Sequence, residues 1–138
     1  MRQIKFRAQD IASNKWLYGD LRHHKDDVCI FEQEGNKGEQ VKRDTIGQFV
    51  GLKDKNGKEI YEGDIVVRRD LTLNIEKVCV VVYNSEIASF RLQHQNKMYT
   101  TRYDFISSDT YNDGKCKIDT KYEYEVIDNV YDDKYSEL

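Results

Sequence analysis

The sequence contains no proline and little alanine. Alanine has the highest helix propensity of all residues, so its scarcity removes the residue type that favours helices most. The absence of proline removes one common means by which proteins block the edge of a β-sheet against a second chain. Both absences favour a sheet-rich protein whose strand edges can pair with another copy.

Cysteine and histidine are also scarce, with three of each. Cys29, Cys79 and Cys116 lie far apart, and no two of them have the spacing of metal ligands. An odd number of dispersed cysteines is typical of reduced thiols in a cytoplasmic protein. His23 and His24 are neighbours, and neighbouring side chains on an extended strand point to opposite faces and chelate one metal poorly. We therefore expect neither a metal site nor a cofactor.

The chain also lacks long apolar runs and nucleotide-binding motifs. No stretch approaches the roughly 20 apolar residues that a membrane-spanning helix requires. The N-terminal segment has no hydrophobic run of the kind found in signal peptides, and neither a GxGxxG motif nor a P-loop occurs. No catalytic set can be assembled around the three histidines. We expect a non-enzymatic, cytoplasmic protein that does not contact a membrane.

Charged residues make up 34% of the chain, and their signs are unevenly distributed. Residues 1–102 contain 18 Lys and Arg against 15 Asp and Glu, a net charge of +3, whereas residues 103–138 contain 4 against 10, a net charge of −6. An acidic region is usually a solvated surface. The alternative is that it meets the basic part of a second copy.

The ten tyrosines and five phenylalanines favour strands over helices. Alternation of apolar and polar residues predicts strands over residues 4–8, 46–52 and 122–126. The run Val78–Tyr83 consists of β-favouring residues only and predicts a strand that is buried on both faces. The short segments on either side of residues 95–97 are predicted to pair as a hairpin.

The opening segment is predicted to be a half-buried strand. Ile4, Phe6 and Ala8 share one face, and Lys5 and Arg7 lie on the other, which is expected to face solvent. Residues 16–18, Trp-Leu-Tyr, form the next predicted strand. The simplest topology pairs these two strands as an antiparallel hairpin.

The central segment contains two predicted turns. Asn and Gly tolerate positive φ, so Asn56-Gly57 predicts a tight reversal with Gly57 at positive φ. Residues 62–64, Glu-Gly-Asp, predict a second turn. We interpret Asp54 and Asp64 as turn formers, because aspartate side chains commonly bond to nearby backbone groups, and not as catalytic acids.

The same segment, GLKDKNGKEIYEGDIV at Gly51–Val66, resembles the central motif of the YopX family, which is found mainly in phages and prophages of Gram-positive bacteria. Arg2–Ala8 resembles the opening motif of the family, and Tyr124–Tyr131 resembles its closing motif. Two positions depart from the family pattern: Gln9 stands where an aromatic residue is usual, and the tail has no proline before its last acidic residues. The resemblance spans the whole chain and implies no catalytic residue.

Alternation and resemblance together predict a mainly β fold, a small antiparallel barrel or sandwich in which any helix is short. We expect residues 1–57 to form an N-terminal β-rich subdomain. Residues 58–138 are expected to form a small barrel-like core. The two parts should pack as one compact unit.

Two classes of function remain. The first is a non-enzymatic, self-assembling accessory protein of phage or prophage origin in a bacterial host, a homo-oligomer with a host or phage protein as a further partner. The second is a regulatory protein that binds nucleic acid weakly through basic residues interleaved with aromatic ones. The basic candidates are Arg68, Arg69, Arg91, Lys97 and Arg102, and the aromatic candidates are Tyr83, Phe90, Tyr99 and Tyr103. The sequence pI of about 5.6 favours the first class, because nucleic-acid-binding domains usually have a net basic surface.

Overall fold

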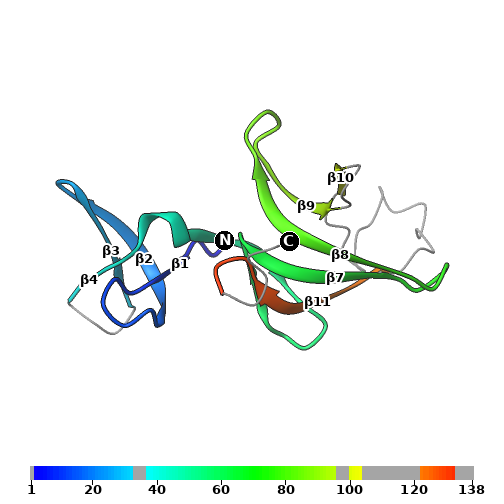
Figure 1. Ribbon diagram of the computed structural model, residues 1–138, viewed down its shortest axis with the longest axis horizontal. Helices are drawn as coiled ribbons and strands as arrows, with labels where there is room; N and C mark the ends of the chain where they lie inside the picture. The colour runs from blue at the N-terminus through cyan, green and yellow to red at the C-terminus, as the bar shows by residue number, and fades with distance from the viewer. Residues whose placement is uncertain (1, 33–36, 96–99, 104–121, 133–138) are drawn as a thin grey trace. The chain divides into compact units, whose positions relative to one another are not determined.

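The computed structural model describes residues 2–32, 37–95, 100–103 and 122–132. Among these residues, the regular structure is β-strand apart from the short 3-10 helix η1 (Arg43–Thr45) (Figure 1). The prediction of a mainly β fold with short helices is therefore confirmed. The described strands form antiparallel sheets and do not close into a barrel.

The chain divides into two compact units, residues 1–52 and 53–138. In the first unit the strands lie side by side in the order β4-β3-β2-β1-β5. Their bounds are β1 (Phe6–Gln9), β2 (Trp16–His24), β3 (Asp27–Phe31), β4 (Glu39–Gln40) and β5 (Gly47–Lys53). The packing of the two units as one compact body stays a prediction.

The predicted N-terminal hairpin is confirmed. Strand β1 pairs antiparallel with β2, and Gln9 lies opposite Trp16. A small core gathers beneath these strands, and its fully enclosed members are Ala8, Val28, Ile30 and Val41. Burial of these aliphatic side chains holds the first unit's sheet together through the hydrophobic effect.

The predicted solvent exposure of Arg7 is wrong. Its side chain is buried, with an exposed fraction of 4%, and its guanidinium carbon lies 4.7 Å from the ring centroid of Trp16. A guanidinium can cover an aromatic face while its stem packs on apolar surface. Strand β1 is consequently enclosed on both faces, which a pattern of apolar and charged residues does not predict.

The second unit contains a five-stranded antiparallel sheet in the order β10-β9-β8-β7-β11. The bounds of its strands are β7 (Asp64–Asp70), β8 (Ile75–Asn84), β9 (Ser89–Gln95), β10 (Thr100–Tyr103) and β11 (Tyr122–Asn129), and the short β6 (Glu59–Tyr61) precedes them. Figure 1 shows β11, in orange, alongside β7, in green, although they are distant in the sequence. The predicted hairpin around residues 95–97 corresponds to the pairing of β9 with β10.

Strands β7 and β8 differ in how they are buried. Ile65 and Val66 in β7 are fully buried although their side chains leave opposite faces of the strand. In β8 the face that carries Val78 is open, since Val78 is 45% exposed, whereas Cys79 on the opposite face is enclosed. Tyr83 lies on the same face as Cys79, near the end of the strand, and is 48% exposed. The prediction that Val78–Tyr83 is buried on both faces is therefore wrong. A central strand has both backbone edges paired, and that does not require both side-chain faces to be covered.

The two turns of the central segment form as predicted. Gly57 has a φ of 81° and Gly63 a φ of 85°. The Oδ1 atom of Asp54 accepts backbone N–H groups inside the first turn, at 2.9 Å from Lys58 N. Asp64 Oδ2 accepts the N–H of Tyr61 at 2.8 Å. Both aspartates therefore hold turns.

The first of these turns also covers the outer edge of β11. The N–H of Lys55 donates to the carbonyl of Tyr124 at 2.9 Å, and the N–H of Val126 donates to Asp54 Oδ2 at 3.0 Å. An open strand edge is a template for another chain. The turn occupies this edge with groups of the same chain, so strand addition is blocked there.

Candidate functional site

The basic residues expected to bind nucleic acid do not lie together on one face of the sheet. Arg68 and Arg69 are neighbours in β7, so their side chains leave opposite faces. Arg69 lies opposite Glu76 in β8, and Arg91 in β9 lies opposite Val82. Because Glu76 and Val82 are an even number of residues apart, Arg69 and Arg91 share one face and Arg68 lies on the other.

Two of the aromatic candidates, Tyr83 and Phe90, are separated from Arg91 in the same way, and Tyr99 lies outside the described residues. Tyr83 lies opposite Phe90, and their ring centroids are 5.3 Å apart in an edge-to-face arrangement. Phe90 is adjacent to Arg91, so this aromatic pair and Arg91 lie on opposite faces. Of the other two basic candidates, Arg102 lies in β10 and Lys97 lies outside the described residues.

Arg69 belongs to a cluster of balanced charges. Its Nε donates to Glu76 Oε1 at 2.6 Å and its Nη1 donates to Glu125 Oε2 at 2.8 Å. Lys55 Nζ lies 3.4 Å from the same Glu125 oxygen. The hydrogen bonds from Arg69 and Lys55 lower the pKa of Glu125, so this carboxylate stays ionised. Two cations and two carboxylates neutralise one another here, which makes Arg69 a poor ligand for nucleic-acid phosphate.

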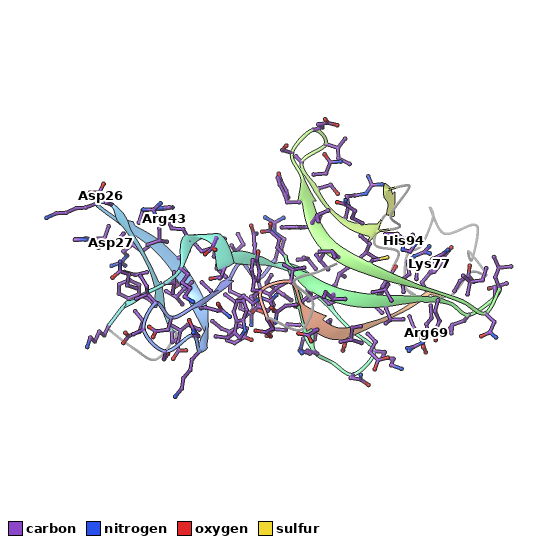
Figure 2. The ribbon with its side chains drawn as sticks, viewed as in Figure 1. Asp26, Asp27, Arg43, Arg69, Lys77 and His94 are labelled. Carbon is purple, nitrogen blue, oxygen red and sulfur yellow. The ribbon has the colours of Figure 1, made fainter. Side chains whose placement is uncertain are left out.

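A second group of basic residues lies on the opposite face. Arg68 in β7 is directly opposite Lys77 in β8, and Cys79, two residues further along β8, is opposite His94 in β9. Opposite residues of antiparallel strands share a face, as do residues two apart. Figure 2 shows Lys77 and His94 on one side of the sheet and Arg69 on the other. We call Arg68, Lys77 and His94 the basic face.

Neighbouring groups hold two members of the basic face in position. The guanidinium carbon of Arg68 lies 3.9 Å from the ring centroid of Tyr122, a cation–π contact that orients the guanidinium plane. His94 Nδ1 lies 3.1 Å from the carbonyl oxygen of Val78. A carbonyl oxygen only accepts, so Nδ1 carries a proton and donates it. The other ring nitrogen, Nε2, donates to a ligand only when the ring is protonated.

Cys79 lies fully buried between the basic residues. Burial raises the pKa of the Cys79 thiol to about 11, and the charges of Arg68 and Lys77 offset only part of this effect. The thiol is therefore neutral at pH 7, and the thiolate is the nucleophilic form of cysteine. Cys79 is therefore a core residue. The effect of both cations on the pKa of its thiol shows that Arg68 and Lys77 lie on the same face of the sheet as Cys79.

Metal binding has no support among the residues that the structure describes, where no group of three His, Cys, Asp or Glu side chains is placed to hold an ion. His23 and His24 are exposed at the end of β2. Cys116 lies outside the described residues. The expected absence of catalytic, cofactor-binding and metal-binding residues stays a prediction.

Sequence reasoning included Arg68 but missed Lys77 and His94. Alternation along β7 was enough to separate Arg68 from Arg69. Placing Lys77 opposite Arg68 requires the register of the β7–β8 hairpin. The turn of four residues, 71–74, between these strands sets that register. A one-residue change of register moves every side chain of a strand to the other face.

The family comparison covers both units of the chain. A family model described as YopX protein matches residues 5–135. The chain belongs to the YopX family. This match confirms the resemblance seen in the opening, central and closing segments. A comparison with curated proteins finds no match.

In this YopX-family chain the central segment Gly51–Val66 contains the residues that form two tight turns. Gly57 and Gly63 take positive φ values, which glycine adopts without steric cost. Asp54 and Asp64 accept backbone N–H groups. The glycine and aspartate residues of the segment that carries the family resemblance are thus explained by the two turns that they form. Among the described residues, no helix of the YopX-family chain has the length and apolar character needed to cross a membrane.

Proposed function

We propose that this YopX-family protein is a non-enzymatic accessory protein of phage or prophage origin that assembles with copies of itself in the cytoplasm of a bacterial host. The observation that carries the proposal is the apolar tip of the β7–β8 hairpin, residues 71–75. Family membership supports the phage-type assignment. A host or phage protein is the further partner that we propose.

Large apolar side chains are exposed along this tip. Leu71 is 49% exposed, Leu73 is 64% exposed and Ile75 is 45% exposed. No charged residue interrupts residues 71–75, which read Leu-Thr-Leu-Asn-Ile. Scattered exposed apolar residues are ordinary, but a contiguous group indicates an interaction site.

The tip is held in one conformation by its own hydrogen bonds. Asp70 Oδ1 accepts the N–H of Thr72 at 2.9 Å and the N–H of Leu73 at 3.0 Å. Asn74 takes a φ of 54°, in the left-handed region that asparagine tolerates well. The apolar side chains are therefore presented on a fixed turn, and a partner that covers them loses little backbone entropy on binding.

A second copy of the chain is the partner that the tip fits best. In a two-fold symmetric dimer the same patch meets itself, so an apolar tip is complementary to the tip of another copy. Pairing through the β11 edge is blocked by the turn that contains Asp54. Burial of the apolar side chains of the tip is the source of binding energy that we propose. The unlike net charges of residues 1–102 and 103–138 would steer the encounter more than hold the assembly.

We expect the wild-type protein to have a mass of two or more chains of 16.4 kDa at both low and high salt, because apolar burial does not depend on ion pairing. Leu71→Ser combined with Leu73→Ser should shift the mass toward that of one chain. Light scattering coupled to size exclusion measures both masses.

Ile4→Ser combined with Ile11→Ser is the matched control, since Ile4 is 55% exposed and Ile11 is 51% exposed, both in the first unit. This control should retain the wild-type mass. A wild-type mass of one chain in both buffers would contradict self-assembly, and an unchanged mass of the leucine variant would contradict the role of the tip.

The second candidate function is weak binding of single-stranded nucleic acid. The contact of Arg68 with the Tyr122 ring favours it, because basic residues beside aromatic rings are typical of single-strand-binding surfaces. The separation of Arg68 from Arg69 and Arg91 onto different faces weakens it. We rank it below self-assembly for this reason.

Binding to single-stranded DNA is expected to be weak at low salt and lost as salt is raised, because binding to phosphates releases counterions. Fluorescence anisotropy of a labelled oligonucleotide over a salt series measures it. Tight binding that persists at high salt would contradict this expectation. It would rank nucleic-acid binding above self-assembly as the function of the protein.

A further inference from the structure

We propose that Asn56 is a modification site, at which the side-chain amide is lost by deamidation, and that the product loosens the turn that covers the edge of β11. The proposal goes beyond self-assembly and does not depend on it. We call residues 54–58 the latch, because the turn that they form is bonded to Tyr124 and Val126 of β11. The latch slows the reaction at Asn56 and is damaged by its product.

The chemistry requires an asparagine whose side-chain carbonyl carbon is within reach of the next backbone nitrogen. The nitrogen of Gly57 forms a bond to Cγ of Asn56, and the bond between Cγ and the amide nitrogen breaks. The proton of the Gly57 nitrogen passes through water to the departing group, which leaves as ammonia. Water then opens the cyclic imide at one of its carbonyl groups. One opening gives aspartate, and the other gives isoaspartate, in which the main chain runs through the former side chain.

Local sequence and exposure favour this reaction at Asn56. Asn56-Gly57 is the only Asn-Gly pair in the sequence, and glycine has no Cβ atom to crowd the attacking nitrogen. Both residues are exposed, and a Cβ built on Gly57 would meet no atom within 4 Å. This side of the turn therefore has space for the cyclic imide and for the water that opens it.

The folded latch holds the reaction back. The Gly57 N–H donates to the carbonyl oxygen of Asp54 at 3.0 Å, and the Asn56 N–H donates to Asp54 Oδ1 at 2.9 Å. The attacking nitrogen is thus held in a hydrogen bond within the turn, and its proton is shared with a carbonyl group instead of water. Ring closure requires the turn to open first, so the free energy of this local opening adds to the barrier.

Contacts with β11 set the cost of opening the latch. The Lys55 N–H donates to the carbonyl of Tyr124 at 2.9 Å, and Lys55 Nζ lies 3.4 Å from Glu125 Oε2. The N–H of Val126 donates to Asp54 Oδ2 at 3.0 Å. The side chain of Asp54 therefore joins the turn to β11, because one oxygen accepts from the turn and the other from the strand.

Isoaspartate at position 56 would disturb the latch because it lengthens the main chain by a methylene group inside a tight turn. The bond from Gly57 to the Asp54 carbonyl spans this position, as does the bond from the Lys58 N–H to Asp54 Oδ1 at 2.9 Å. Neither bond keeps its geometry when the path between its ends is longer. The outer-edge groups of Tyr124 and Val126 then lose their partners, and an unpaired strand edge is a template for another chain.

The test follows the full-length wild-type protein during incubation at mildly alkaline pH, folded in buffer and unfolded in guanidinium chloride. Peptide mapping by mass spectrometry measures the loss of the Asn56 amide, and chromatography separates the aspartate and isoaspartate peptides. The unfolded chain should react at least about tenfold faster than the folded protein, because the latch is absent. Asp54→Ala should raise the rate in buffer by a similar factor, since it removes the acceptor that ties the turn to β11.

Matched controls separate the latch from general effects. Asp44→Ala removes an exposed carboxylate from another part of the chain and should leave the rate within about twofold of wild type. Asn14 and Asn74 are also exposed, but the residues that follow them carry side chains, and both should keep their amides in the folded protein. In the unfolded chain Gly57→Ala should slow the loss at least about tenfold, because its methyl group crowds the attacking nitrogen.

Amide hydrogen exchange of incubated wild-type protein tests the consequence without any substitution. The amide of Val126 should exchange at least about tenfold faster in the isoaspartate fraction than in the unmodified fraction, since its acceptor on Asp54 is displaced. The amide of Ile30, in the core of the first unit, should exchange equally in both fractions. An unchanged exchange rate at Val126 would overturn the proposed damage to the latch.

Retention of the Asn56 amide in the folded and the unfolded chain alike would overturn the proposal, as would equal rates of loss in the two states. The double leucine variant of the hairpin tip should deamidate as wild type does. Its failure to dissociate would contradict the role of the tip in self-assembly and would leave the modification site untouched.

Discussion

Gly63→Ala is expected to lower the free energy of unfolding by about 3 kcal/mol, which combines backbone strain with a steric clash. Gly63 has a φ of 85°, where a residue with a Cβ atom is strained. A Cβ at this position would lie 2.6 Å from Cε2 of Tyr131. The backbone cannot shift away easily, because the Gly63 N–H donates to Val81 and its carbonyl accepts from Val130, both at 2.9 Å.

Gly57→Ala separates the two contributions. Gly57 has nearly the same φ, 81°, but a Cβ there would meet no atom within 4 Å. Its cost should be the backbone strain alone, about 1 kcal/mol. Urea denaturation of both variants gives the difference directly. Equal destabilisation by the two substitutions would mean that the Tyr131 ring moves aside at no cost.

Asp54→Ala is expected to destabilise the protein by about 3 kcal/mol, since it removes a buried acceptor of several backbone N–H groups. Asp54 Oδ1 accepts from Asn56 and Lys58, each at 2.9 Å, and Oδ2 accepts from Val126 at 3.0 Å. The side chain is only 8% exposed. Its loss would leave enclosed donors without a partner and would free the turn from β11.

The pH dependence of this effect follows from the pKa of Asp54. Burial alone raises the pKa of this carboxyl, but the N–H groups of Val126, Lys58 and Asn56 outweigh burial and lower it. A lowered folded-state pKa means that the stabilisation is complete above the unfolded value, about 3.9. It is lost as pH falls through the folded-state pKa. The difference in stability between wild type and Asp54→Ala should therefore be constant near pH 7 and shrink below about pH 4.

Asp44→Ala is the control for Asp54→Ala, because it removes an exposed carboxylate from the short helix η1. Its effect should lie within about 0.5 kcal/mol of zero. Denaturation of all three proteins from pH 7 to pH 3 measures the comparison. A constant difference between wild type and Asp54→Ala across this range would show that the carboxylate charge is not what the backbone N–H groups stabilise.

Local sequence patterns predicted the elements that depend on neighbouring residues. Alternation located β1, β5 and β11, and Asn56-Gly57 predicted a reversal with positive φ. These features follow from the conformational preferences of a few adjacent residues. Any fold that contains this segment would need a turn there, so its prediction required no knowledge of the rest of the chain.

Burial was predicted less well, because it depends on what packs against a strand. Val78–Tyr83 has the composition of a strand buried on both faces, yet Val78 and Tyr83 are nearly half exposed. Arg7 has the character of a surface residue, yet it is enclosed beside Trp16. In both cases the residue type indicated strand, while the neighbours in space decided exposure.

The candidate site shows the same difference between what local sequence predicts and what strand pairing decides. The five basic residues proposed from the sequence were chosen because they are interleaved with aromatic residues, but adjacent residues of a strand face opposite ways. Arg69 was therefore assigned to the same surface as Arg68, although it is balanced by Glu76 and Glu125 on the other face. Lys77 and His94, which are distant in the sequence from one another, were not among the proposed nucleic-acid-binding residues.

The sequence by itself determined the class of fold, the family and the positions of the main strands and turns, because these depend on short-range backbone preferences and on a contiguous motif. Only the tertiary structure decided which side chains share a face. The register between β7, β8 and β9 placed Arg68 opposite Lys77 and set Cys79 opposite His94. Register is a property of the pairing between strands, and a shift of one residue reverses the faces of a whole strand without changing any local preference.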